Sequence, residues 1–357
     1  MKKPLLLAII LFMCCVAYAQ EDVTFWFVVP DVSQNGGEGL DRPIFLRMTA
    51  FATAATVTIS QPAGGGLPTS VISIPANSTM SFDLTPWIAS VENTPPNTVL
   101  NKGILIQSTA PISAYYSVVG GPVCLCNPED FVLKGRNAVG TDFWIPGQNI
   151  LNNSLSYTPT PTNAFDIVAT ENGTTVTITP SQNIVGHAAG TTFTVLLNAG
   201  QTYSATAAST IAAFHLVGSR VTSNKPIAIT EKDDLLADFS LGVEGDDLIG
   251  DQIVPSNVCG TEYIPMYGGL TTPGDQLFIT ATQPATTISV NGVYVTTIAT
   301  AGGTYQMAAP SPSCYIQTNL PVYVYHLSGI HSEVGSALLP QINCTGSNSV
   351  SIQNRRR

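Results

Sequence analysis

The chain has 357 residues, a formal net charge of −10 at pH 7 and only 10% charged residues. This acidic balance argues against nucleic acid or an anionic membrane surface as a partner, because both attract basic proteins. Thr, Ser, Gly, Pro, Val and Ile dominate the composition, which favours short strands and turns over helices.

The first nineteen residues read MKKPLLLAIILFMCCVAYA. Lys2 and Lys3 precede a short apolar run that ends in an A-x-A pattern, which is typical of a secretory signal peptide cleaved after Ala19. Lipoprotein processing at Cys14 or Cys15 is the weaker alternative, because bulky residues stand where small ones are required. The apolar run is too short to span a membrane, and no later run is long enough. We therefore expect a secreted or cell-surface protein without membrane insertion.

The mature chain aligns with itself as three units, at residues 20–121, 140–231 and 260–346. Each begins with an aromatic strand that ends at a proline: VTFWFVVP, DFWIP and EYIP. Strands with alternating apolar residues follow in each unit. Each unit then closes with an expected hairpin whose turn ends at a proline, namely Pro111, Pro226 or Pro321. The same elements recur in one order three times, which indicates a repeat.

About six short strands per unit, with turn signals every 8–12 residues, predict an all-β fold of three tandem antiparallel β-sandwich-like units. The alternative is a single β-propeller-like assembly in which each unit supplies two blades. Adjacent aromatics on a strand point to opposite faces. One ring of Phe143-Trp144, and one of Phe25-Trp26, is therefore expected in a core, and the outward ring is a candidate for stacking on a glycan.

Two linkers, residues 122–139 and 232–259, separate the units, and residues 347–357 form a C-terminal tail. The second linker is rich in carboxylates and is expected to be either a solvated loop or a cation site. Calcium prefers several oxygen ligands on a flexible loop, and the predicted ligands are Asp233, Asp234, Asp246 and Asp247. The spacing matches neither an EF-hand nor an RTX repeat, and no other cofactor is predicted.

Five cysteines remain after removal of the signal peptide. In an exported protein they are candidates for disulfide bonds, and they are Cys124, Cys126, Cys259, Cys314 and Cys344. An odd number leaves one unpaired, or paired to another chain or to sequence outside this one. The single C-x-C lacks the second pair or the histidines of a zinc site.

Catalytic patterns are missing from the sequence: it has no G-x-S-x-G elbow and no phosphate-binding glycine loop. His326, His331 and Glu333 lie close together in HLSGIHSE, but their spacing fits no standard metal site. A surface loop is the favoured interpretation of this stretch. No enzyme activity is therefore expected.

Three long runs resemble the IgGFc-binding-protein N-terminal domain family: KPIAITEKDD (225–234), DLIGDQIVPSNVCGTEYI (247–264) and LPVYVYHLSGIHSEVGSALLPQINCTGS (320–347). Members occur in secreted bacterial proteins and at the N-terminus of a mucin-like animal protein. The resemblance implies an extracellular binding or adhesion module without catalysis, and Fc need not be the ligand. The family often has a cysteine before EVGSALLP, where this chain has His331 and Ser332. Related sequences usually continue past CTGS, so the C-terminus is expected to be truncated.

The preferred hypothesis is a secreted or cell-surface binding protein that recognises a protein or a glycan through loops and sheet faces of the tandem units. A structural spacer or scaffold for a missing C-terminal domain is the second hypothesis. A carbohydrate-active enzyme with a site assembled across units is the third. The sequence predicts no oligomeric state.

Overall fold

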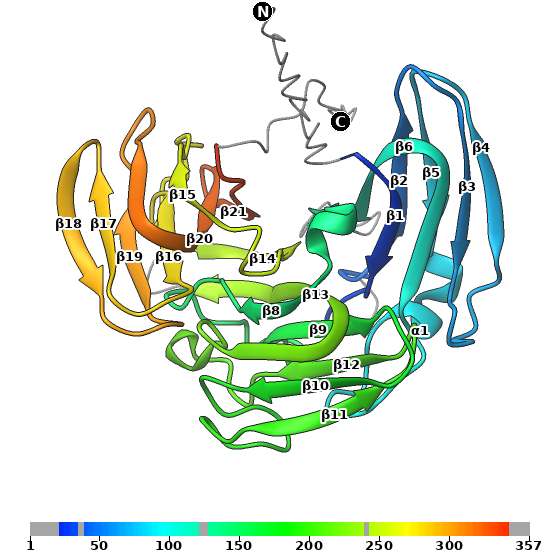
Figure 1. Ribbon diagram of the computed structural model, residues 1–357, viewed down its shortest axis with the longest axis horizontal. Helices are drawn as coiled ribbons and strands as arrows, with labels where there is room; N and C mark the ends of the chain where they lie inside the picture. The colour runs from blue at the N-terminus through cyan, green and yellow to red at the C-terminus, as the bar shows by residue number, and fades with distance from the viewer. Residues whose placement is uncertain (1–20, 35–38, 121–127, 239–242, 343–357) are drawn as a thin grey trace, which may run out of the picture.

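The computed structural model describes residues 21–34, 39–120, 128–238 and 243–342. They form three seven-stranded antiparallel sheets, one in each predicted unit. The sheets follow one another around an open arc (Figure 1). The prediction of three tandem all-β units is therefore confirmed. The predicted signal peptide and the C-terminal tail lie outside the described residues.

The first unit carries its strands and short helices in this order: β1 (Asp22–Phe27), β2 (Ile44–Ala50), β3 (Ala55–Ser60), β4 (Ser70–Ile74), β5 (Ser78–Asp83), η1 (Thr85–Trp87), α1 (Ile88–Val91), β6 (Ile104–Val118), β7 (Glu129–Leu133) and η2 (Gly135–Ala138). The second has β8 (Gly140–Trp144), β9 (Asn163–Ala169), β10 (Thr174–Thr179), β11 (Phe193–Leu197), β12 (Thr202–Thr206), η3 (Ala212–Phe214), β13 (Arg220–Asp238) and β14 (Val243–Gln252). The third has β15 (Gly260–Tyr263), β16 (Gln276–Ala281), β17 (Thr286–Val290), β18 (Val293–Ile298), β19 (Thr304–Ala308), β20 (Ile316–Ile330) and β21 (Glu333–Leu338).

One long strand organises each unit. The sheet orders are β4-β3-β6-β2-β5, β11-β10-β13-β9-β12 and β18-β17-β20-β16-β19. In the first unit, residues 104–108 of β6 pair with β1 and β3, and residues 112–118 pair with β2 and β7. The long strand thus runs from one layer of the unit into the other. Each unit is closed by this crossing strand and encloses its own apolar core.

The expected closing hairpins are wrong, because each is one continuous strand that bends. Pro111 lies where β6 exchanges its partners, so its missing N–H leaves no gap in a ladder. Just before the proline, the Ser108 hydroxyl donates to the carbonyl of Ala110 at 2.6 Å. The same bond recurs from Ser223 to Lys225 and from Thr318 to Leu320. A hydroxyl residue three positions before a proline resembles a turn in sequence, but here it marks a bend.

The paired aromatics divide as expected. Phe143 is fully buried in the core of the second unit. Trp144 is partly buried, and the Arg220 guanidinium lies 4.6 Å from the centre of its ring. A Cβ placed on Gly302 of the third unit would lie only 2.4 Å from Trp144, so this ring is covered by a neighbouring unit. The prediction that one ring enters the core is confirmed, and the other ring is an inter-unit contact.

The expected solvated linker at residues 232–259 is wrong, because most of it is the hairpin of β13 and β14. β14 packs against β7 of the first unit and β21 of the third. Leu248 of β14 enters the core of the first unit, whereas Ile249 packs with Phe278 and Tyr325 of the third. The propeller alternative is also wrong, since each unit is one sheet and not two blades. The apolar residues between the acids drive this burial.

Candidate functional site

The four predicted calcium ligands do not form a metal-binding group, because each has its own hydrogen-bond partners. Asp233 accepts hydrogen bonds from Gln148 and Asn153 and lies 3.0 Å from His215 Nδ1. Asp234 accepts from the Ser33 amide at 2.9 Å. No group of three or more histidine, cysteine or acidic side chains in the described part of the chain is arranged to hold a metal. Calcium binding therefore stays a prediction without support from this geometry.

The remaining two predicted ligands also have separate partners. Asp246 accepts from the Tyr157 hydroxyl, and Asp247 accepts from the Val334 amide of β21 at 2.9 Å. Burial raises the pKa of Asp247 to about 7. Nearby, Asp251 bonds both Lys134 Nζ at 2.5 Å and the Leu338 amide at 3.1 Å. Asp234, Asp247 and Asp251 therefore accept hydrogen bonds that join the second unit to its neighbours, whereas Asp233 and Asp246 bond within the second unit.

The described cysteines are not bonded to each other. Cys314 is buried, Cys259 is partly buried, and both are free thiols. Three further disulfide candidates, Cys124, Cys126 and Cys344, lie outside the described residues. The disulfide framework thus stays a prediction.

The histidines of HLSGIHSE do not converge. His326 is buried, with its Nε2 atom 3.1 Å from Asp275 Oδ2. His331 and Glu333 are exposed at the β20–β21 turn, where His331 has a φ of 60°. The Asp275 carboxylate also accepts from the Ser328 hydroxyl and from the amides of the 268–270 loop. It anchors a loop and is not placed as part of a metal site.

A cavity of about 650 Å³ lies between the first two units, and we call it the inter-unit cavity. The first unit contributes the segment from α1 to the start of β6, together with residues 31–34. The second contributes parts of β9, β12 and β13 and the loop before β9. Its ionisable lining residues are Asp31, Glu92, Lys102, Asp166 and Lys232. These positions are distant in sequence, so no motif could have revealed them; the one local signal is Asp166 inside the otherwise apolar strand FDIVA.

Two of the residues that line this cavity are buried carboxylates, and each has one oxygen without a hydrogen-bond partner among the described residues. Glu92 is 5% exposed, and its Oε1 atom has no hydrogen-bond partner among the described residues. Asp166 is 1% exposed; its Oδ1 accepts from Asn93 Nδ2 at 2.7 Å, whereas its Oδ2 has no partner in the described part of the chain. Burial raises the pKa of Glu92 to about 9, assisted by the negative charges of Asp31 and Asp41. Burial likewise raises the pKa of Asp166 to about 7.

Both lysines of the cavity are held by other groups. Lys102 Nζ donates to the carbonyls of Ala89, Glu92 and Thr94 at 2.6–3.1 Å, which uses its three N–H bonds. Lys232 Nζ donates to the Asp31 carbonyl and to Asp234 Oδ2. Neither ammonium makes a hydrogen bond to the unsatisfied oxygens of Glu92 and Asp166.

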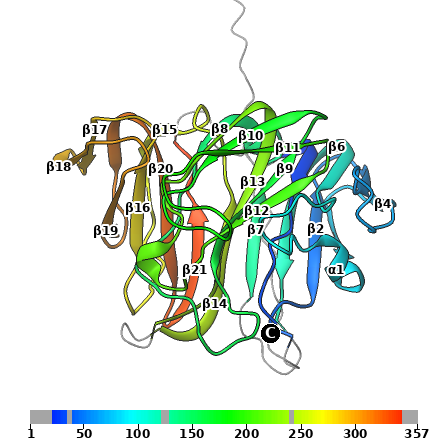
Figure 2. The same cartoon turned by 90° about the horizontal axis from the view of Figure 1, so that it is seen from below.

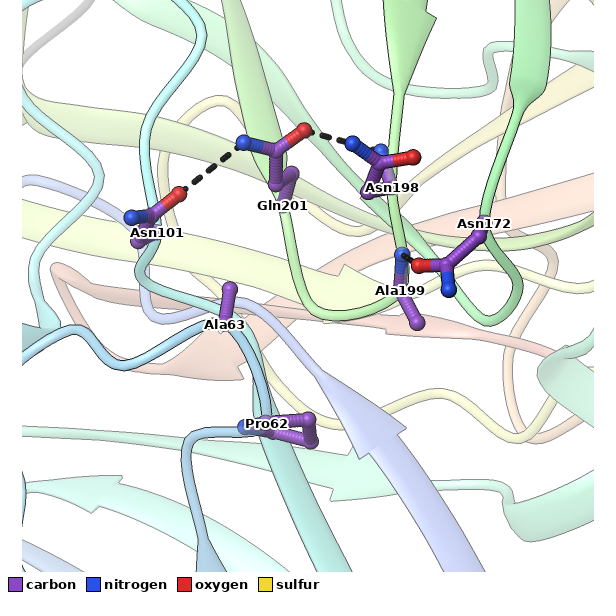
Figure 3. Close-up of a pocket in the computed structure, with 7 residues that line it drawn as sticks. All are labelled: Pro62, Ala63, Asn101, Asn172, Asn198, Ala199 and Gln201. Carbon is purple, nitrogen blue, oxygen red and sulfur yellow. Dashed lines mark hydrogen bonds between the residues drawn. The ribbon is translucent and has the colours of Figure 1, made fainter.

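A second, shallower pocket of about 400 Å³ lies where the turns of the first two units meet (Figure 3). Amide side chains dominate its wall. Gln201 Nε2 donates to Asn101 Oδ1 at 3.1 Å, and its Oε1 accepts from the Asn198 amide at 2.8 Å. Asn172 Oδ1 accepts from the Ala199 amide at 3.0 Å. These bonds hold the turns together, so the pocket is best explained as part of the unit junction.

The outer strands carry exposed apolar side chains. On β18, Val293 is 68% and Tyr294 is 62% exposed, and Val295 is exposed next to them. A two-residue turn at Asn291-Gly292, with both φ angles positive, joins this strand to β17. The corresponding strands β4 and β11 expose single apolar residues, Val71 at 67% and Leu196 at 66%. β4 and β18 lie at opposite ends of the molecule (Figure 2).

Comparisons with known proteins place the chain. No helix in the described residues is long and apolar enough to cross a membrane. A search of curated proteins finds no match. One solved structure, an anti-sigma factor domain-containing protein from Clostridium clariflavum, aligns over 89% of this chain and 81% of its own with 8% identity, but its TM-score of 0.15 carries no argument. The family model described as IgGFc binding protein matches residues 129–352, which is more than half of the chain. The chain therefore belongs to this family.

Proposed function

We propose that this protein is a secreted or cell-surface binding protein that recognises an extracellular protein through the outer strand β18 of its third unit. Membership of a family described by binding to IgG Fc supports a binding role and a protein partner. The matched region includes the whole third unit. We do not extend Fc itself to this chain, because a family's name describes the ligand of some members only.

The exposed run Val293-Tyr294-Val295 is the observation that carries the proposal. β18 pairs only with β17 among the described strands, so its outer edge presents free backbone donors and acceptors. Edge strands with several exposed apolar residues promote unwanted pairing, and proteins usually block them with charges or prolines. None of those devices interrupts this run. An extended segment of a partner is able to add to the edge while its side chains pack on Tyr294.

The other two units offer a natural comparison. Leu196 of β11 is as exposed as Val293, but its neighbours Thr194 and Asn198 are polar. A single exposed apolar residue is ordinary on a protein surface. The third unit is therefore the preferred docking position.

The test is a binding screen with the mature chain, residues 20–357, against arrays of extracellular proteins and of glycans, with IgG Fc as one defined probe. We expect saturable binding to at least one protein. Replacing Tyr294 with Ser should weaken that binding at least about tenfold, whereas Leu196→Ser should leave it unchanged.

Three outcomes would contradict the proposal. Binding to glycans alone would point to a different ligand class, and equal loss in the two variants would point away from β18. Silence on both arrays would favour the spacer hypothesis. Unchanged thermal unfolding of both variants is required before any loss is interpreted.

A further inference from the structure

We propose that the inter-unit cavity binds a small organic cation, through its ammonium or guanidinium group, with the carboxylates of Glu92 and Asp166 as the recognition groups. The proposal does not depend on the function proposed for β18, which lies in the third unit. It rests on the two unsatisfied carboxylate oxygens, the charge around them and the shape of the cavity.

The two residues that carry the unsatisfied oxygens, Glu92 and Asp166, come from different units and both line the same cavity. Buried polar atoms in proteins almost always have a hydrogen-bond partner, and each exception needs an explanation. Glu92 follows the short helix α1 of the first unit, and Asp166 lies on β9 of the second. Asn93 joins the two sides, because it donates to Asp166 and accepts from the Thr202 hydroxyl. The carboxylate of Asp166 is thus held by a hydrogen bond across the junction.

The carboxylates of Glu92 and Asp166 would attract a cation when ionised. Asp31 also lines the cavity, and the negative charges of Asp31 and Asp41 both act on Glu92. Of the two lysines that line the cavity, Lys102 donates to three carbonyls, and Lys232 donates to the Asp31 carbonyl and to Asp234. The protein cations near the cavity are therefore committed to other acceptors. The charge of Lys232 acts on both Glu92 and Asp166, but neither ammonium hydrogen-bonds their unsatisfied oxygens, so a donor from outside would complete these carboxylates when they ionise.

The cavity is too large for a bare ion and has walls for an organic body. Its volume of about 650 Å³ falls in the range of small-molecule sites. Ile88, Pro96, Pro159 and Val185 provide apolar contact, and the hydroxyls of Ser204 and Thr206 provide neutral hydrogen-bonding groups. We infer an ammonium or guanidinium on an alkyl or similar body. Such a group is carried by a free polyamine or by a lysine or arginine side chain.

Proton release follows from the same geometry. Burial raises the pKa of Glu92 to about 9 and that of Asp166 to about 7, so Glu92 holds a proton at neutral pH. A bound cation favours the ionised carboxylates and lowers both pKa values. Binding should therefore release protons and strengthen as pH rises from 6 to 8.5.

The experiment is titration calorimetry of the mature chain with 1,5-diaminopentane and with arginine methyl ester, and separately with a short peptide containing one lysine. Pentanol and pentanoate serve as neutral and anionic controls. We expect the amine probes to bind with proton uptake by the buffer, and the controls not to bind. Binding of the free amines but not the peptide identifies a small-molecule site, and the reverse identifies a side chain of a partner.

Two isosteric variants test the residues independently. Glu92→Gln and Asp166→Asn should each weaken amine binding at least about tenfold and flatten its pH dependence. Glu333→Gln, which removes an exposed carboxylate from the third unit, should change neither. The proposal is overturned if folded wild-type protein binds neither the free amines nor the lysine peptide at millimolar concentration and pH 8.5, if the controls bind equally, or if both cavity variants bind like wild type. None of these outcomes bears on the β18 surface.

Discussion

Glu92 should make the protein less stable as pH rises, and replacing it with Gln should remove that dependence. The carboxyl is 5% exposed, and burial raises its pKa from 4.5 to about 9. In the unfolded chain the same group ionises near its ordinary value. Between those two pKa values the folded state binds the extra proton, so stability falls with increasing pH.

The magnitude follows from the length of that window. One pH unit corresponds to about 1.4 kcal/mol for a single group that is protonated in one state only. From pH 6 to pH 8 the folded Glu92 stays mostly protonated, so its penalty grows by about 2–3 kcal/mol. Glu92→Gln cannot ionise, and its stability relative to wild type should rise by that amount over the same interval.

The assay is urea unfolding of wild type and Glu92→Gln at pH 6 and pH 8. The quantity compared is the difference in unfolding free energy between the two proteins, measured at each pH. The change in this difference from pH 6 to pH 8 does not contain the direct structural effect of the substitution or the titration of Asp166 and Asp247, which both proteins share. Glu333→Gln is the control, because its carboxylate is exposed. A stability difference that moves by less than about 0.5 kcal/mol between pH 6 and pH 8 would refute the buried, proton-bearing Glu92.

Two further substitutions test the unit junctions. Gly302→Ala should lower the free energy of unfolding by about 2–3 kcal/mol, because the added Cβ would lie 2.4 Å from Trp144 and the φ of this residue is +76°. Gly292→Ala is the control: its φ of +80° is similar but its Cβ would meet open space, so it should cost only about 1 kcal/mol. Equal losses in the two variants would show that the clash with Trp144 does not matter. Asp251→Asn should cost about 3 kcal/mol because it leaves the buried ammonium of Lys134 uncompensated, and adding Lys134→Met should restore part of that loss in a double-mutant cycle. Full additivity of the two changes would show that the ion pair contributes nothing.

The sequence predicted what depends on local pattern. Alternating apolar residues identified the strands, and the doublet Phe143-Trp144 identified a strand entering a core, because both signals arise within one strand. Pro111 was placed correctly at a change of direction, but sequence cannot distinguish a turn between two strands from a bend within one. That distinction depends on which strands pair on either side of the proline.

The site could not be predicted, because its chemistry depends on burial. Asp233 and Asp234 look like solvated acids in a charged stretch, whereas packing of Leu235, Leu236 and Ile249 buries them in a hairpin. Glu92 is an ordinary surface residue by type. Only its burial in the folded chain leaves its carboxylate with an unsatisfied oxygen and raises its pKa to about 9.

The family match begins at residue 129, but the packed structure also includes the first unit, which precedes that residue. β7, the first matched strand, pairs with β6 of the unmatched first unit. Leu248 of the matched hairpin fills the core of that unit, and Lys232 donates to its Asp31 carbonyl. Without the first unit, Lys232 and the buried Asp234 would lose that side of their environment, and Leu248 would be exposed. The first unit is therefore part of the same packed structure, and it supplies half of the cavity that no single unit contains.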